Sequence, residues 1–151
     1  MRVREFDQAL SAVTSCQPRG LRNQQIEPNG ILTFDWQGNM SVFSPELIGQ
    51  PAPEYDDFVF GNPVRDPDAS HWHSAAFRRA HTDIRAGVEA CRRGCNYFDF
   101  CGGGAPANKL YELGRLDGTE TLYCRLTKKN LIDLMVEELE QELGIEAVTA
   151  G

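Results

Sequence analysis

Residues 91 to 104 read Cys91-Arg-Arg-Gly-Cys95-Asn-Tyr-Phe-Asp-Phe-Cys101-Gly-Gly-Gly104, and this stretch decides how the chain is organised. Three and five residues separate its cysteines, and twenty-two more lead to Cys124. The fifth cysteine, Cys16, has no other cysteine within seventy residues. We therefore treat Cys91, Cys95, Cys101 and Cys124 as one candidate set and interpret Cys16 as a separate free thiol.

A helix should lead into the first two cysteines. Apolar side chains recur at three- and four-residue spacing, which predicts a helix over residues 74–94. The residues of this apolar stripe are Phe77, Ala80, Ile84, Val88 and Cys91. Asp68 or Ser70 is the expected N-terminal cap, and Gly94 is the expected end. Residues four apart share one helix face, with Cβ atoms about 5–6 Å apart, so Cys91 and Cys95 should both face inward.

Other elements are expected on either side of this helix. Residues 31–36 and 40–43 are β-rich runs around Gln37-Gly38-Asn39, which predicts a hairpin. Residues 126–143 have the pattern of an amphipathic helix. Its apolar stripe comprises Leu131, Leu134, Met135, Leu139 and Leu143. The predicted fold class is α+β, with a β-hairpin, a cysteine-bearing helix, a glycine-rich cluster loop and a C-terminal amphipathic helix.

The length of 151 residues suits one compact domain. Phe6, Leu10 and Val13 at helical spacing predict a short helix, and Pro18-Arg19-Gly20 should end it. We expect residues 1–24 to be an N-terminal helical segment that could be the remnant of a preceding domain. Residues 25–145 would then be the cysteine-bearing domain, and residues 146–151 a tail.

The cysteine spacing has three interpretations. Three thiolates from one loop and a fourth from a distant segment can wrap an iron–sulfur cluster, which is the interpretation that we favour. Structural zinc is the main alternative, although such sites usually combine two similar cysteine pairs, and Cys124 has no partner for a second pair. Four buried cysteines that bind nothing are the third, because free cysteine is often buried.

Residues next to the cysteines fit a cluster as well. The backbone of residues 102–104 carries no Cβ atoms, so it can approach a bulky cluster and donate N–H groups to its sulfides. Arg92, Arg93 and Lys109 could offset the negative charge of a cluster held by four thiolates.

The pattern extends beyond the cysteines. It comprises the run from Cys91 to Lys109, then Glu112, Gly114, Glu120-Thr121 and Cys124-Arg125, and also Phe43-Ser44-Pro45-Glu46-Leu47 after the hairpin. Over about residues 24–139 the chain resembles the C-terminal SPASM-type region of radical SAM peptide maturases. The likeness is greatest to the cyclophane-forming maturases, which cross-link aromatic side chains in ribosomally made peptides.

This resemblance implies that Cys91, Cys95, Cys101 and Cys124 ligate an auxiliary [4Fe-4S] cluster. Its role would be to hold or pass electrons and to help bind the peptide. The implied partners are a radical SAM catalytic domain or subunit and a ribosomal precursor peptide. The alternative function is a structural zinc-binding module for protein interaction.

The chain also departs from that family. The C-x3-C-x2-C loop that binds the S-adenosylmethionine-cleaving cluster is absent, because Cys101 follows Cys95 three residues too late. The chain is also too short for the catalytic barrel. We expect a C-terminal portion or a stand-alone partner, with no catalytic residues of its own, that cannot cleave S-adenosylmethionine alone.

Composition excludes other classes. A formal charge of −7 disfavours binding to nucleic acid phosphates and to anionic membranes. No apolar run approaches the roughly 20 residues that span a bilayer. The N-terminus lacks a secretory signal, so we expect a cytoplasmic protein without disulfides. Hydrolase motifs such as G-x-S-x-G and H-E-x-x-H are absent.

Two further groups of residues receive structural interpretations. His71, His73 and His81 are interpreted as surface histidines near a helix start rather than as a second metal site. Glu112 and Glu120 are expected to cap helices and form local salt bridges rather than bind a peptide.

Overall fold

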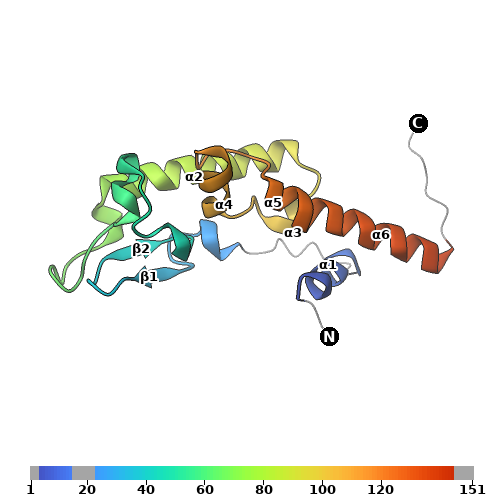
Figure 1. The fold of residues 1–151 in the computed structure, drawn as a ribbon, viewed down its shortest axis with the longest axis horizontal. Helices are drawn as coiled ribbons and strands as arrows, with labels where there is room; N and C mark the ends of the chain where they lie inside the picture. The colour runs from blue at the N-terminus through green and yellow to red at the C-terminus, as the bar shows by residue number, and fades with distance from the viewer. Residues whose placement is uncertain (1–3, 15–22, 145–151) are drawn as a thin grey trace.

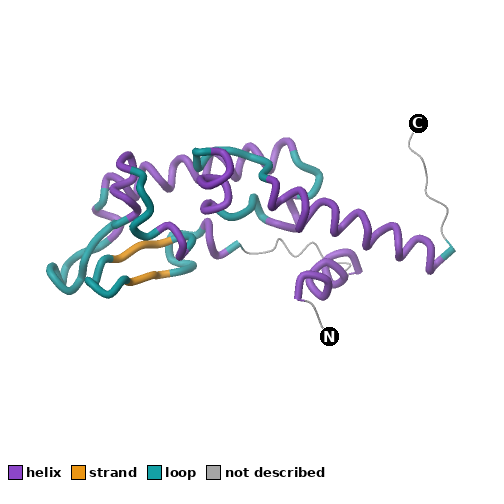
Figure 2. Tube along the Cα trace, viewed as in Figure 1, coloured by secondary structure: helices purple, strands orange, loops and turns teal. Residues whose placement is uncertain are grey.

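The structure is a computed structural model that describes residues 4–14 and 23–144. An antiparallel two-stranded hairpin and a set of helices form an α+β fold, which confirms the predicted class. Helix α2 (Ala75–Gly94) lies along the molecule, the hairpin lies near one end, and α6 (Asn130–Leu143) extends beyond the other (Figure 1). Helices and loops make up most of the chain between them (Figure 2).

The predicted hairpin is present, with shorter strands than expected. Strand β1 (Leu32–Phe34) pairs with β2 (Met40–Val42), with Leu32 opposite Val42 and Phe34 opposite Met40. The strands end early because the Asp35 carboxylate accepts the backbone N–H groups of Gln37 and Asn39 at 2.8 and 2.9 Å, which closes the turn. Strand β2 is entirely buried.

Helix α2 begins at Ala75, later than a cap at Asp68 or Ser70 would have placed its start. The Ser74 hydroxyl accepts the Phe77 N–H at 3.1 Å, so the expectation that Asp68 or Ser70 is the cap was wrong. The short 3-10 helix η4 (His71–His73) lies between Ser70 and Ser74. The cap of α2 is therefore Ser74. Gly94 is the last residue of α2, as predicted. The twenty residues of this helix span about 30 Å.

The main core packs against the N-terminal half of α2. We call its five aromatic residues the aromatic core: Phe43, Tyr55, Phe58, Phe60 and Phe77. The Phe43 and Phe77 rings stack at 5.7 Å, and Phe60 meets Phe77 edge-on at the same separation. Short 3-10 helices complete this end: η1 (Gln24–Ile26), η2 (Pro45–Leu47) and η3 (Pro53–Phe58). Tyr55 fastens η3 to α2 by donating its hydroxyl to Asp83 at 2.9 Å.

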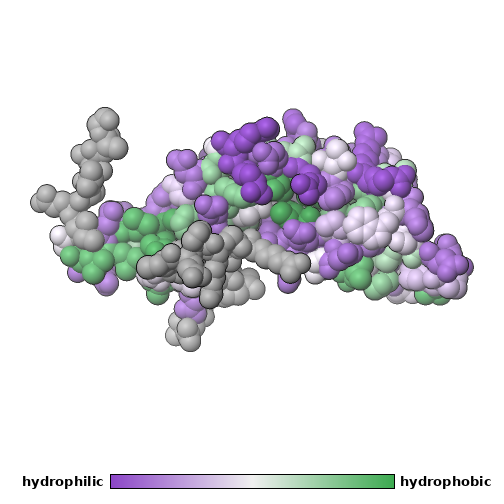
Figure 3. Space-filling model, turned by 180° about the vertical axis from the view of Figure 1, so that it is seen from behind, coloured by the Kyte–Doolittle hydropathy of each residue, from purple (hydrophilic) through white to green (hydrophobic). Residues whose placement is uncertain are grey.

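The C-terminal helix departs from the prediction in register. It starts as a π-helix, η5 (Arg125–Lys129), and continues as α6, which contacts α1 (Arg4–Thr14). Of the predicted stripe, Leu131, Met135 and Leu139 are half-buried, whereas Leu134 and Leu143 are 62% and 69% exposed. The buried residue is Ile132. Apolar surface gathers at this end of the molecule (Figure 3). No helix in the described part of the chain is long and apolar enough to cross a membrane.

Candidate metal centre

The first two cysteines lie at the C-terminal end of α2. Cys91 is in the last turn, and Cys95 directly follows the helix. The Cys95 N–H donates to the Cys91 carbonyl at 3.0 Å, so the helical hydrogen bonding extends to the second cysteine. Both thiols are half-buried. The core-facing stripe of α2 therefore leads from the aromatic core to this pair.

The third cysteine ends a short helix, α3 (Phe98–Cys101), and a glycine turn follows it. Gly102, Gly103 and Gly104 have φ angles of 61°, 96° and 76°, a left-handed conformation that strongly favours glycine. A Cβ atom on Gly103 would lie 3.0 Å from Cγ2 and 3.2 Å from Cα of Val88. The turn therefore lies directly against α2, one helical turn before Cys91, where no larger residue fits.

Two hydrogen bonds hold this loop in place. The Asn23 side-chain amide donates to the Gly104 carbonyl at 2.8 Å. The Tyr97 hydroxyl donates to Asp133 of α6 at 2.6 Å. The segment from Cys95 to Gly104 is thereby tied to η1 on one side and to α6 on the other.

The fourth cysteine lies on α5 (Leu122–Cys124), whose first turn is capped twice. The Thr121 hydroxyl accepts the Cys124 N–H at 3.0 Å. The Glu112 carboxylate, from α4 (Pro106–Leu113), accepts the N–H groups of Leu122 and Tyr123. Glu120 pairs with Arg125 and Lys129. The capping and salt-bridge roles predicted for Glu112 and Glu120 are confirmed.

All four candidate cysteines line one cavity of about 220 Å³, which we call the cysteine cavity. They reach it from three segments, namely the end of α2, α3 and α5. The other lining residues are Ala90, Gly94, Gly103, Gly104, Ala105, Lys109, Thr119, Glu120, Thr121 and Lys129. The structure thus brings together every member of the candidate set, and Cys16 lies outside the described residues.

The described residues contain no ready-made metal-binding group. Within residues 4–14 and 23–144, no three His, Cys, Asp or Glu side chains form a group that could hold a metal ion. Burial raises the pKa of the Cys91 thiol and that of the Cys124 thiol, and the nearby Cys95 and Cys101 thiols raise both further. Any ligand that needs thiolates must therefore displace protons on binding.

Lysine rather than arginine supplies the positive charge at the cavity. Lys109 is only 3% exposed, and burial lowers its pKa while neighbouring thiols oppose that shift. Arg92 and Arg93 do not line the cavity; they are 60% and 73% exposed and pair with Glu89 at 3.4 and 4.0 Å. One and two residues beyond Cys91, they lie on other faces of the helix, so they do not contact the cavity, and their expected role in offsetting cluster charge stays a prediction.

Sequence reasoning missed Lys129. It lines the cavity, pairs with Glu120, and lies 5.6 Å from the centre of the Tyr97 ring. The Glu120 carboxylate raises the pKa of Lys129. Its position follows from the π-helix η5, and no periodicity in the sequence predicts a π-helix.

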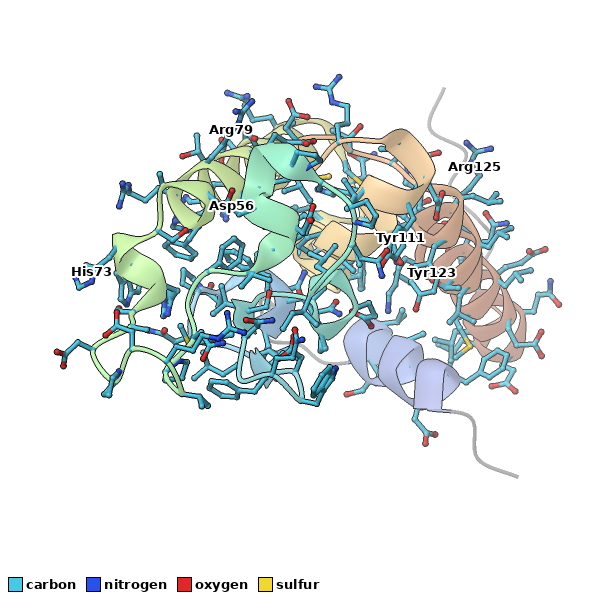
Figure 4. The ribbon with its side chains drawn as sticks, turned by 60° about the vertical axis from the view of Figure 1, so that its left-hand side comes forward. Asp56, His73, Arg79, Tyr111, Tyr123 and Arg125 are labelled. Atoms are coloured by element: carbon cyan, nitrogen blue, oxygen red, sulfur yellow. The ribbon has the colours of Figure 1, made fainter. Side chains whose placement is uncertain are left out.

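The three histidines lie at the other end of α2, near the aromatic core. His73 is exposed, as expected, and projects outward (Figure 4). His71 is 7% exposed and packs edge-on against Phe77 at 4.8 Å, so its interpretation as a surface histidine was wrong. His81 is half-buried, with its ring stacked 5.7 Å from that of Phe77. The Phe43 ring, which stacks 6.0 Å from that of His81, comes from a distant segment that local sequence does not reveal.

A second, open groove of about 500 Å³ shares a wall with the cysteine cavity; we call it the polar groove. The shared wall consists of Cys101, Gly104, Ala105, Thr121 and Cys124. The remaining lining residues are Asn23, Gln25, Glu46, Phe100, Ala107, Asn108, Tyr123 and Lys128. Beside it, the Tyr111 hydroxyl donates to the Glu46 carbonyl at 2.9 Å; Figure 4 labels Tyr111 and the groove residue Tyr123.

Comparison with known proteins adds one relative. No family model matches the chain, and no solved structure matches it. Over 144 residues the chain is 40% identical to a protein of Synechocystis sp. (strain ATCC 27184 / PCC 6803 / Kazusa) that bears the name "Uncharacterized protein sll1766". The match covers 95% of this chain and 36% of the relative, so the chain spans about a third of the length of the protein that it matches.

Proposed function

We propose that this chain binds a [4Fe-4S] cluster through Cys91, Cys95, Cys101 and Cys124 and serves as an auxiliary electron-transfer domain of a radical SAM peptide maturase. The observation that carries the proposal is the convergence of these four cysteines, from three separate segments, on one cavity. Four thiols without a histidine or carboxylate among them are the usual ligand set of such a cluster.

The choice between a cluster and zinc depends on the bulk of the occupant. A zinc ion about 2.3 Å from each of four sulfurs requires sulfurs only about 3.8 Å apart. A cluster separates its ligand sulfurs more widely, because iron and sulfide ions lie between them. The glycine turn fits a bulky occupant, since Gly103 and Gly104 bring bare backbone to the cavity wall.

Each group of residues at the site has a separate proposed role. When bound, the cluster accepts and returns single electrons. The four cysteines hold it, the Thr121 and Glu112 caps fix the helix that carries Cys124, and the glycine turn excludes side chains from its surface. The polar groove offers amide and aromatic side chains beside two of the ligands, which suits contact with an extended ribosomal precursor peptide.

The catalytic half would come from another domain or subunit. The relative is consistent with that arrangement: if 144 residues are 36% of it, about 250 more lie outside the match, and a (β/α)8 barrel typically needs about 250. We expect this additional part of the relative to contain the C-x3-C-x2-C motif that this chain lacks. Its absence there would contradict the radical SAM part of the proposal and leave the cluster part untouched.

Anaerobic reconstitution with iron and sulfide tests the cluster. We expect a brown protein with about four iron and four sulfide per chain. A colourless protein that binds one zinc and no iron would contradict the proposal and favour the structural zinc module. The loaded chain mixed with S-adenosylmethionine and a reductant should form no 5′-deoxyadenosine. Formation of that product above a no-protein control would show that the role is not auxiliary.

A further inference from the structure

Lys109 is an exceptional residue of the cysteine cavity. It belongs to the buried face of α4 together with Pro106 and Ala107, and only 3% of it is exposed. Lysine is almost never fully buried unless its charge is compensated, because removing an ammonium group from water is costly. Its presence in the cavity wall therefore calls for a negative partner.

The groups that face Lys109 offer it no free carboxylate. The ionisable groups that act on it most strongly are the thiols of Cys91, Cys101 and Cys124, followed by Asp117. Asp117 is engaged by Arg115 through two bonds of 2.5 and 2.7 Å. An anionic group in the cavity would therefore balance the ammonium charge.

The other cations near the cavity differ from Lys109. Lys129 is paired with Glu120, so this pair adds little net charge to the wall. Arg92 lies outside the cavity, exposed and paired with Glu89. Lys109 thus contributes a positive charge that is both buried and unmatched by a free carboxylate.

We propose that Lys109 sets the reduction potential of the cluster by stabilising its reduced, more negative state. The inference rests on the proposed function. In reduction, one electron passes from a low-potential one-electron donor to the cluster, and no bond to the protein forms or breaks. The added negative charge lies near a fixed positive charge in a poorly solvated cavity, where their attraction is stronger than in water. Net charge around a cluster is one of the quantities that set its potential.

Three variants of the full chain test this, each reconstituted anaerobically and titrated with EPR detection of the reduced cluster. Lys109→Met removes the charge at similar length, and Lys109→Arg keeps it. Arg92→Met changes the net charge by the same amount outside the cavity and is the matched control. At the midpoint potential of the wild type, the ratio of reduced to oxidised cluster in Lys109→Met should be at least tenfold lower. This corresponds to a shift of the midpoint potential by about 59 mV toward negative values. Lys109→Arg and Arg92→Met should shift by much less.

An unchanged potential in loaded Lys109→Met, or an equal shift in Arg92→Met, would overturn the inference. If Lys109→Met takes up no iron while Lys109→Arg does, the cluster requires a positive charge at this position. That result supports the inference. If neither takes up iron, the lysine acts through packing, and the inference is overturned. A wild-type chain that takes up no cluster overturns the proposed function instead, so the two failures are distinguishable. Amide exchange of β1 and β2 verifies that each variant is folded.

Discussion

The aromatic core and the cysteine cavity lie against opposite ends of one helix, α2, but different forces stabilise them. In the aromatic core, Phe43, Phe58 and Phe77 are 0–1% exposed; the rings of Phe43 and Phe77 stack, and Phe58 meets Phe60 edge-on. In the cysteine cavity, half-buried thiols and a buried lysine surround about 220 Å³ of space. The first is filled by packed side chains, whereas the second encloses an open cavity.

This difference assigns separate roles to the two ends. Close packing of apolar side chains supplies free energy without any ligand. A cavity with a buried charge lowers stability unless something fills it and balances that charge. We infer that the aromatic core provides the folding energy and that the cysteine cavity gains its rigidity on ligand binding, as in small metal-dependent domains.

The largest effect on stability is expected from Phe77→Ala. This ring is 1% exposed and contacts Phe43, Phe60 and His71. Its loss should lower the free energy of unfolding by about 3–5 kcal/mol, measured by urea denaturation. Phe34→Ala, at a ring that is 54% exposed, is the control and should cost far less. Equal losses in the two variants would show that the aromatic core is not the centre of stability.

Removing a ligand should affect only the other end. Cys101→Ser or Cys124→Ser should lose most of the bound iron and increase amide exchange in the glycine turn and around α5, while the hairpin stays protected. The effect should be weaker around Ala107 and Leu116, which are 4% and 1% exposed members of the core. Full iron content and unchanged exchange in Cys124→Ser would mean that Cys124 is not a ligand.

Cys16→Ser is the matched control for that experiment. It removes one thiol that the sequence spacing separates from the candidate set of four. Iron content and exchange should match the wild type. Loss of iron in this variant would add Cys16 to the ligand set.

A smaller, local effect is expected from Gly103→Ala. The new Cβ would meet Val88 at 3.0 Å, and the residue would keep a φ of 96°, so the turn should move away from α2. The cost should be about 1–3 kcal/mol, seen as faster exchange in the turn and reduced iron uptake. Gly94→Ala, also in the cavity wall, has no atom within 4 Å of its Cβ and should be tolerated. Similar behaviour of the two variants would contradict a tight approach of the turn to α2.

The smallest effect on stability is expected from acid, which should destabilise the aromatic core. Burial lowers the pKa of His71 and of His81, so the folded state favours the neutral rings. The unfolded pKa is about 6.5, so this stabilisation is present above that pH and is lost as the pH falls through the lowered folded values. Urea midpoints followed by Trp72 fluorescence should decrease between pH 7.5 and 5.5. His71→Phe should flatten that decrease, and an unchanged slope would exclude His71 as a contributor.

Local patterns predicted much of the fold. The apolar period of α2, its end at Gly94 and the hairpin turn around Gly38 follow from backbone and side-chain preferences within a few residues. The candidate cysteines were also identified from the sequence, because three of the four lie close together along the chain. The cap at Ser74 was missed because the η4 turn in front of it depends on how His71 packs against Phe77.

The sequence by itself determined the α+β class, the helix that carries Cys91 and the set of four cysteines, since periodicity and spacing act along the chain. Only the tertiary structure decided that Cys124 reaches the same cavity, that Lys109 is buried there, and that Arg92 and Arg93 face solvent. Burial and charge compensation depend on neighbours far away in sequence. Such neighbours are set by the packing of α2, α4 and α5, and no local pattern encodes them.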